Sequence, residues 1–207
     1  MALSLATVGG KITAYLFNQV VGAVNKQGMT AIVPTGVTPS GGMATVGTNG
    51  VITLSAVSNE LGINGLFTSG FDNYRLILNL NKSASYDLAV RMRSTGLDNS
   101  AAQYNSQRTG VSGTATNASQ QLAGTSWPWD QGAVIGATDF IVDLLGPALV
   151  TATRATTSFG SVSSTGATTV GTGYHVHSVA TAYDGLGLIF ASGTVTGTIR
   201  VYGYNNN

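Results

Sequence analysis

The chain has 207 residues, a formal net charge of +1 and no cysteine. Only 8% of its residues are charged, against roughly 25% in an average soluble domain, so its charge gives no reason to expect nucleic acid or an anionic membrane as a partner. Without cysteine there is no disulfide, thiolate metal site or cysteine nucleophile. The 28 glycines indicate many turns. This composition suits an assembly component better than an enzyme.

The first predicted element is an amphipathic helix over residues 11–27. Its apolar residues recur at spacings of three and four, and Gly28 is placed to end it. The stripe packs either on the chain's own β-region or around an oligomer axis, where it would mediate attachment or oligomerisation. The residues of this stripe are Ile12, Tyr15, Leu16, Val20, Ala23 and Val24.

A change of composition follows the helix. Residues 30–50 contain two prolines and a cluster of glycines, which indicates a linker rather than a core element. We therefore expect an N-terminal unit of residues 1–45, made of an extended segment, the helix and the linker, and a β-sandwich domain of residues 46–207. Residues 46–56 predict the first hairpin of that domain, with Asn49-Gly50 as its turn.

Two long alternating segments are predicted to be the central strands. In residues 71–80 the side chains of Tyr74, Leu76, Leu78 and Leu80 fall on one face of the strand. Residues 194–204 alternate in the same way and place Ile199 and Val201 in the core.

The remaining strands are shorter. They are predicted at residues 85–94, 137–147, 148–158, 174–180 and 186–190. The strand 85–94 is expected to pair with 71–80 as a hairpin, and 186–190 with 194–204. Residues 97–126 have few apolar side chains and predict a long polar loop. The fold predicted is mainly β, an antiparallel jelly-roll-like sandwich after one helix.

Few residues are suited to chemistry. His175 and His177 would share a strand face and could offer two nitrogens to a metal, but no carboxylate lies near them in the sequence, so a surface or inter-subunit pair is the alternative. Asp139 and Asp143 share a face, and either they or one of them with Asp130 could serve glycoside hydrolysis. No nucleophile elbow accompanies them. We expect no enzymatic activity, no cofactor and no bound metal.

Two tryptophans flank a proline in the segment SWPWD. Trp127 and Trp129 would suit stacking on sugar rings, or else they anchor the segment in the core. Together with Tyr104 of the polar loop, they are the predicted ligand contacts.

Three stretches of the sequence resemble phage virion proteins of the minor tail and tail-fibre type. They are the strand FDNYRLILNL with the following LxVRMRxxGxDNS, the closing ATAYDGLGLIFxSGTVTGTIRVYGY, and the opening VGGKITAYLFN with NKQG. The likeness spans most of residues 8–110 and 174–204 and includes no catalytic motif. It implies a protein that is made in the host cytoplasm, is commonly trimeric and acts within the particle.

From this resemblance we expect a tail-associated fibre or receptor-binding module that displays its β-sandwich. The alternative is a capsid decoration protein, of the cement or head-fibre type, that binds and stabilises the shell. The expected partners are two further copies of the chain in a homotrimer, other virion proteins and a host surface glycan.

Overall fold

The computed structural model describes residues 28–131 and 135–205, so the predicted helix of residues 11–27 and its apolar stripe lie outside the described residues. The described chain is mainly β, contains no helix, and forms one large antiparallel sheet of 14 strands. The strands are β1 (Met29–Ala31), β2 (Gly36–Pro39), β3 (Met43–Val46), β4 (Ile52–Asn64), β5 (Asn73–Lys82), β6 (Ala89–Ser94), β7 (Leu97–Asp98), β8 (Tyr104–Ser112), β9 (Ala115–Gly124), β10 (Trp127–Pro128), β11 (Gly136–Leu145), β12 (Ala152–Ser163), β13 (Thr168–Ala180) and β14 (Gly185–Tyr204).

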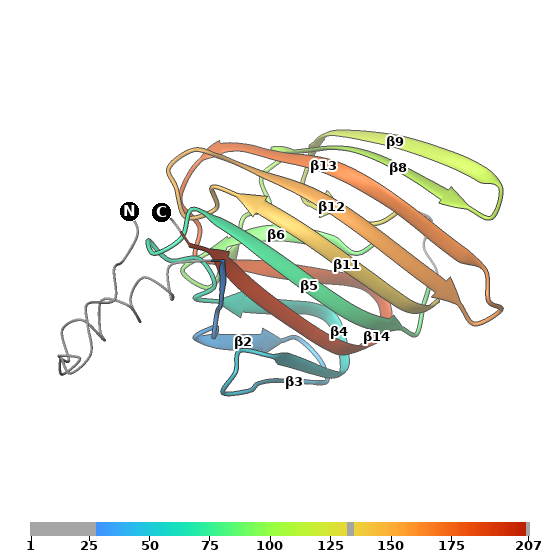
Figure 1. The fold of residues 1–207 in the computed structure, drawn as a ribbon, viewed down its shortest axis with the longest axis horizontal. Coiled ribbons are helices and arrows are strands. Elements are labelled where there is room, and N and C mark those ends of the chain that lie inside the picture. Colours follow the sequence, from blue (N-terminus) through green and yellow to red (C-terminus); the bar gives the residue numbers. More distant parts are fainter. Residues whose placement is uncertain (1–27, 132–134, 206–207) are drawn as a thin grey trace, which may run out of the picture.

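The strands follow the order β10-β6-β14-β5-β11-β12-β13-β8-β9, and the broad face from β14 to β9 is visible in Figure 1. Strand β4 runs along β14 and carries β2 and β3, while β1 pairs with β14 and β7 pairs with β6. Strands β5 and β14 lie side by side in the middle of the sheet, which confirms the prediction that they are central.

The alternation of apolar and polar residues along β5 explains its central place in the sheet. Its residues Tyr74, Leu76 and Leu78 are almost completely buried, together with Ile199 and Val201 of β14, as predicted. In register with β5, the neighbouring strand β11 brings Phe140 opposite Leu78 and Val142 opposite Leu76 on the same inner face. Burying such large apolar side chains stabilises the fold by about 1.5–3 kcal/mol each.

Strand β14 is one bent strand of 20 residues, so the predicted hairpin of 186–190 with 194–204 is wrong. Its first part pairs with β6, its second part with β5, and β4 follows it on both sides of the bend. Gly193 and Gly197, with φ of 65° and 137°, lie at the bend and allow it. The segment around Gly193 is therefore not a hairpin turn. Strand β14 stays paired with β4 on both sides of the bend, and the sheet curls there.

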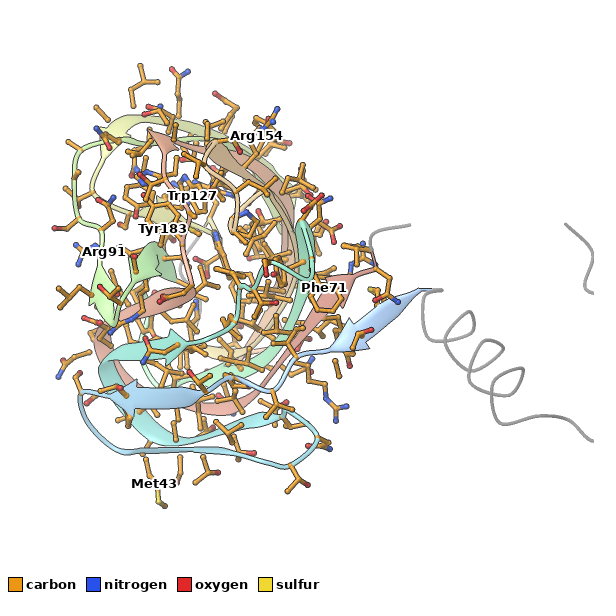
Figure 2. All side chains as sticks on the ribbon, turned by 90° about the vertical axis from the view of Figure 1, so that its left-hand side faces the viewer. Met43, Phe71, Arg91, Trp127, Arg154 and Tyr183 are labelled. Atoms are coloured by element: carbon orange, nitrogen blue, oxygen red, sulfur yellow. The ribbon has the colours of Figure 1, made fainter. Side chains whose placement is uncertain are left out.

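The curl brings the β6 end of the sheet back against β8. The hydroxyl of Tyr104 on β8 accepts a hydrogen bond of 3.0 Å from the backbone nitrogen of Met92 on β6. Figure 2 shows the strands around an interior filled with side chains, with Trp127 and Tyr183 inside and Met43 and Arg154 at the periphery. Two facing layers around one core are consistent with a β-sandwich.

The predicted hairpin of 71–80 with 85–94 is wrong. Strand β5 has β14 and β11 as neighbours, whereas β6 pairs with β14, β10 and β7. The alternating face of β5 is matched along nearly its whole length by these two long strands, and β6 has only six residues to offer. Strands that follow one another in sequence are neighbours only about two-thirds of the time.

Residues 97–126 do not form the predicted loop. They contain β7 and the long hairpin of β8 and β9. On the inner face of β8, Tyr104 is followed by Ser106, Arg108 and Gly110, which are all buried although only Tyr104 is a large hydrophobic residue. The period of two is therefore present in burial but absent in hydrophobicity, so the sequence pattern does not reveal the strand.

The predicted linker at residues 30–50 contains strands as well. Strands β1, β2 and β3 all pair with the sheet, and the boundary expected between residues 45 and 46 falls inside β3. The predicted hairpin is confirmed between β3 and β4, and Gly50 in its turn has a φ of 78°. Strand β4 continues to Asn64, well beyond the expected end.

Both ends of the described chain meet at one end of the sheet. Met29 pairs with Tyr204, and the backbone nitrogen of Asn205 donates a hydrogen bond of 3.1 Å to the carbonyl of Gly28. The turns between β8 and β9 and between β12 and β13 lie at the opposite end, as Figure 1 shows. The sheet therefore has one end that holds the two ends of the described chain and an opposite end that holds the β8–β9 and β12–β13 turns.

The bend of β14 leads to a testable prediction about Gly197. Replacing Gly197 with alanine forces a side chain onto a φ of 137° and places its Cβ 2.1 Å from the carbonyl oxygen of Asn79. We expect this variant to lose at least about 2 kcal/mol of unfolding free energy in urea denaturation. Gly160→Ala is the control, because a Cβ there meets no atom within 4 Å. Equal stability of the two variants would contradict the proposed role of Gly197.

Candidate functional site: the outer face of the sheet

The predicted ligand contacts lie in the interior. Trp127, Trp129 and Tyr104 are each 0% exposed. The rings of Tyr104 and Trp127 meet edge to face with centroids 5.4 Å apart, and Trp129 packs near Phe140. Their burial fits the alternative interpretation, tryptophans that anchor their segment in the core, and leaves no ring surface for a ligand.

The two histidines share a strand face, as predicted, but that face is the buried one. His177 is stacked on Tyr104 with ring centroids 4.1 Å apart, and its Nε2 lies 2.6 Å from the hydroxyl of Tyr183. His175 Nε2 lies 3.0 Å from the hydroxyl of Thr157. Burial lowers the pKa of His175 to about 3 and also lowers the pKa of His177, so both rings are neutral at pH 7.

This geometry does not complete a metal site around the histidines. Among residues 28–131 and 135–205, no three His, Cys, Asp or Glu side chains lie close enough together to hold a metal ion. The histidines instead serve the packing of β13 against β8 and β12, through the ring stacking and the contact with Thr157. The surface or inter-subunit location that the sequence suggested for them is wrong, because both are 0% exposed.

A buried ion pair joins the two layers. Lys82 at the end of β5 lies 2.8 Å from Asp130, and their side chains are 1% and 5% exposed. Lys82 also donates to the carbonyl of Tyr86, and Asp130 accepts from the backbone nitrogen of Leu88. Burial raises the pKa of Asp130, and the neighbouring ammonium opposes that rise. These bonds fix the segment of Trp127 and Trp129 over the inner face of the sheet.

The carboxylates considered for glycoside hydrolysis are held apart from one another. Asp143 receives two hydrogen bonds from Arg75 and one from the hydroxyl of Tyr204, and Asp139 receives one from Asn79. Hydrogen bonding from Arg75 lowers the pKa of Asp143. A general acid needs a raised pKa, and Asp130 lies in the core, so these three residues do not form a catalytic pair.

The outer face of the sheet is the accessible alternative. Because His175 and His177 point inward, the residues that alternate with them on β13 point outward, and Tyr174 is 46% exposed. In register, Tyr174 lies opposite Gln107 on β8, and Gln107 lies opposite Gln120 on β9. The phenol ring of Tyr174 and the two amide side chains thus form one row across β13, β8 and β9, which reaches the edge of the sheet.

A shallow depression of about 160 Å³ lies along this row. It is lined by Asn105, Ser106, Gln107, Gln120, Gln121, Leu122, Tyr174 and Val176. A β-bulge interrupts the register of β8 with β9 beside it, where Ala123 has a φ of 51° and its backbone nitrogen donates to Asn105 Oδ1. Bulges of this kind are common next to binding sites because they redirect side chains. We call the depression the Tyr174 hollow.

A second depression, of about 270 Å³, lies farther along the same strands. It is lined by Thr109, Gly110, Val111, Phe159, Val170, Gly171 and Thr172. Its lining offers two threonine hydroxyls and otherwise aliphatic, aromatic or glycine residues, so it has fewer polar side chains than the Tyr174 hollow. We therefore take the Tyr174 hollow as the candidate site.

Sequence reasoning placed Tyr174 at the start of a strand but gave it no role. The signal that could have found it is the period of two: a strand that buries both histidines must expose Tyr174. The amides opposite it were hidden, because residues 97–126 were predicted to be a loop.

The described residues include no helix long and apolar enough to cross a membrane. Comparison of the chain with protein-family models, with curated proteins and with solved structures finds no match.

Proposed function

We propose that this chain is a non-enzymatic structural protein of a phage virion, associated with the tail, that attaches by its N-terminal portion and displays its β-region as a receptor-binding module. In this proposal the curled sheet is a jelly-roll-like sandwich. The sequence resemblance to minor tail and tail-fibre proteins supports the assignment to a virion. The position of the chain ends is the structural observation that carries the division into an attached end and a displayed end.

Gly28, the first described residue, lies beside Asn205 at one end of the sheet. Strand β12 has 12 residues and spans about 40 Å from that end to the turns at the other. Attachment through the N-terminal portion therefore leaves the turns and the outer face accessible. The Tyr174 hollow lies four strands away from β14 across the sheet, or about 19 Å, so it is also clear of Gly28 and Asn205.

The experiment that tests the location is cryo-microscopy of the virion. We expect density for this chain on the tail. Density at three-fold or quasi-three-fold positions of the capsid would contradict the tail assignment and support the alternative, a capsid decoration protein.

A second experiment tests the receptor-binding role. We expect the purified protein to bind host cells and to reduce phage adsorption when it is added in excess. A protein that neither binds cells nor competes with the phage would contradict this role.

We also propose that the protein is a homotrimer, held together by the apolar stripe of residues 12–24. Equilibrium sedimentation at micromolar concentration should give a mass of three 21.1-kDa chains. Replacing Leu16 with aspartate puts a charge into that stripe and should shift the mass toward the monomer. A wild-type monomer, or a trimer unchanged by the substitution, would contradict the role of the stripe.

A further inference from the structure

The Tyr174 hollow combines one exposed aromatic ring with side chains that carry no charge. No hydrogen bond among the described residues engages the side-chain amides of Gln107 and Gln120 or the hydroxyl of Tyr174. Each primary amide offers two donors and one acceptor oxygen. The hollow thus presents several unengaged donors and acceptors within the reach of one ring.

The apolar side of the hollow is equally well defined. Leu122 is 68% exposed on β9, and Val176 lies on β13 two residues from Tyr174. Residues two apart on a strand share a face, so Val176 continues the outward face that begins with the Tyr174 ring. A ligand in the hollow therefore meets apolar surface from Tyr174 and Val176 on β13 and from Leu122 on β9, with the amide groups of β8 and β9 beside it.

A pyranose sugar has this combination of surfaces. Its axial C–H groups form an apolar face that stacks on an aromatic ring, and its hydroxyls donate and accept hydrogen bonds at the rim. The volume of about 160 Å³ holds roughly five water molecules at liquid density, so the hollow suits one sugar unit rather than a large ligand. The lining contains no charged residue, so it offers nothing to pair with an acidic group.

We infer that the Tyr174 hollow binds one neutral hexopyranose unit of a polysaccharide, with the sugar stacked on Tyr174 and its hydroxyls bound by Gln107 and Gln120. The inference rests on the proposed receptor-binding function, since it names the ligand class of that displayed face. On the outer face, the charged residue in register with the hollow is Arg154, which lies opposite Val176 on β12 and is not part of the lining.

The test uses saturation-transfer NMR on the full chain with the methyl glycosides of glucose, galactose and mannose as probes. At least one neutral glycoside should give a signal with the wild-type protein. Tyr174→Ala should weaken its binding by about tenfold or more, and Gln107→Ala by a smaller factor. Tyr174→Phe should retain most of the binding, because the stacking ring remains.

Tyr202→Ala is the matched control. Tyr202 lies in the same row of the outer face, across Arg75, Asp143 and Thr156, but on β14 rather than in the hollow. The Tyr202→Ala substitution removes a tyrosine from the same face and should leave glycoside binding unchanged. Circular dichroism of each variant shows whether the fold is retained, and Tyr174→Phe covers the case in which Tyr174→Ala does not fold.

Three results would overturn the inference. The first is that no neutral glycoside binds the wild-type protein. The second is that Tyr174→Ala and Tyr202→Ala weaken binding equally. The third is that methyl glucuronide binds more tightly than the neutral probes and loses this advantage in Arg154→Ala, which would mean that the ligand is an acidic sugar.

Failure here is distinguishable from failure of the proposed function. If the wild-type protein reduces phage adsorption but binds no glycoside, the receptor-binding role stands and the carbohydrate inference falls. If a glycoside binds through Tyr174 while the chain is found on the capsid and does not affect adsorption, the sugar site stands and the tail assignment falls.

Discussion

Replacing Asp130 with alanine should lower the free energy of unfolding by about 3–5 kcal/mol. The substitution leaves the ammonium of Lys82 in the core, where the side chain is 1% exposed, with the carbonyl and the ring of Tyr86 as neutral partners and no counter-charge. It also removes the acceptor of the Leu88 backbone nitrogen. A buried charge that loses its partner keeps its desolvation cost without the compensating attraction. Urea denaturation followed by tryptophan fluorescence measures the loss.

A double substitution tests whether Asp130→Ala loses stability because it leaves a buried charge without its partner. In Lys82→Met with Asp130→Asn, neither charge of the pair remains in the core, and the amide oxygen of the new asparagine can still accept from Leu88. We expect this variant to recover most of the stability that Asp130→Ala loses. Asp139→Ala is the control on the outer face, with one hydrogen bond to Asn79, and should cost less than about 1 kcal/mol. A loss below that value for Asp130→Ala would refute the role of the ion pair.

Acid should destabilise the fold between pH 6.5 and about pH 3 through a buried histidine. His175 has a pKa of about 3 in the folded chain, against 6.5 as its ordinary value. Between these two values the unfolded chain binds a proton that the folded chain does not. The contribution of neutral His175 to the free energy of unfolding is therefore fully present above pH 6.5 and falls as the pH drops toward 3. At pH 5 the loss from His175 is about 2 kcal/mol, and His177, whose pKa is also lowered, adds to it.

The matched variant for this prediction is His175→Gln, which keeps a hydrogen-bonding group near Thr157 and removes the titration. The difference in stability between pH 7.5 and pH 5 should be smaller in this variant than in the wild type by about 2 kcal/mol. Asp98 and Asp130 have pKa values raised by burial and contribute with the opposite sign, but they are common to both proteins and cancel in the comparison. An unchanged pH dependence in His175→Gln would show that His175 is not the group responsible.

The central strands could be predicted because their apolar side chains recur with the same period of two as their inward-facing positions. In β5 each inward residue from Tyr74 to Leu80 is apolar, and the burial follows the same period. In β8 the inward residues after Tyr104 are serine, arginine and glycine, so their burial does not follow hydrophobicity. Arg108 is accommodated by Asp87 and by the carbonyl of Asp130, and neither partner is suggested by the local sequence.

The pairing of the strands was harder to predict than their existence. Ala191-Ser192-Gly193 has the composition of a turn, yet β14 continues through it because β4 runs beside it on both sides. The candidate site shares this difficulty. Tyr174 is far in the sequence from Gln107 and Gln120, and only the register of β13, β8 and β9 brings the three into one row.

The continuity of β14 has a mechanical consequence. Its backbone hydrogen bonds to β5, β4 and β6 run perpendicular to the strand, so tension along the long axis of the sheet is shared by many of them at once. Strand β1 is held to β14 by only three residue pairs, and the two ends of the described chain, Gly28 and Asn205, lie side by side. Pulling those ends apart should therefore peel β1 from β14 pair by pair before the longer strands separate.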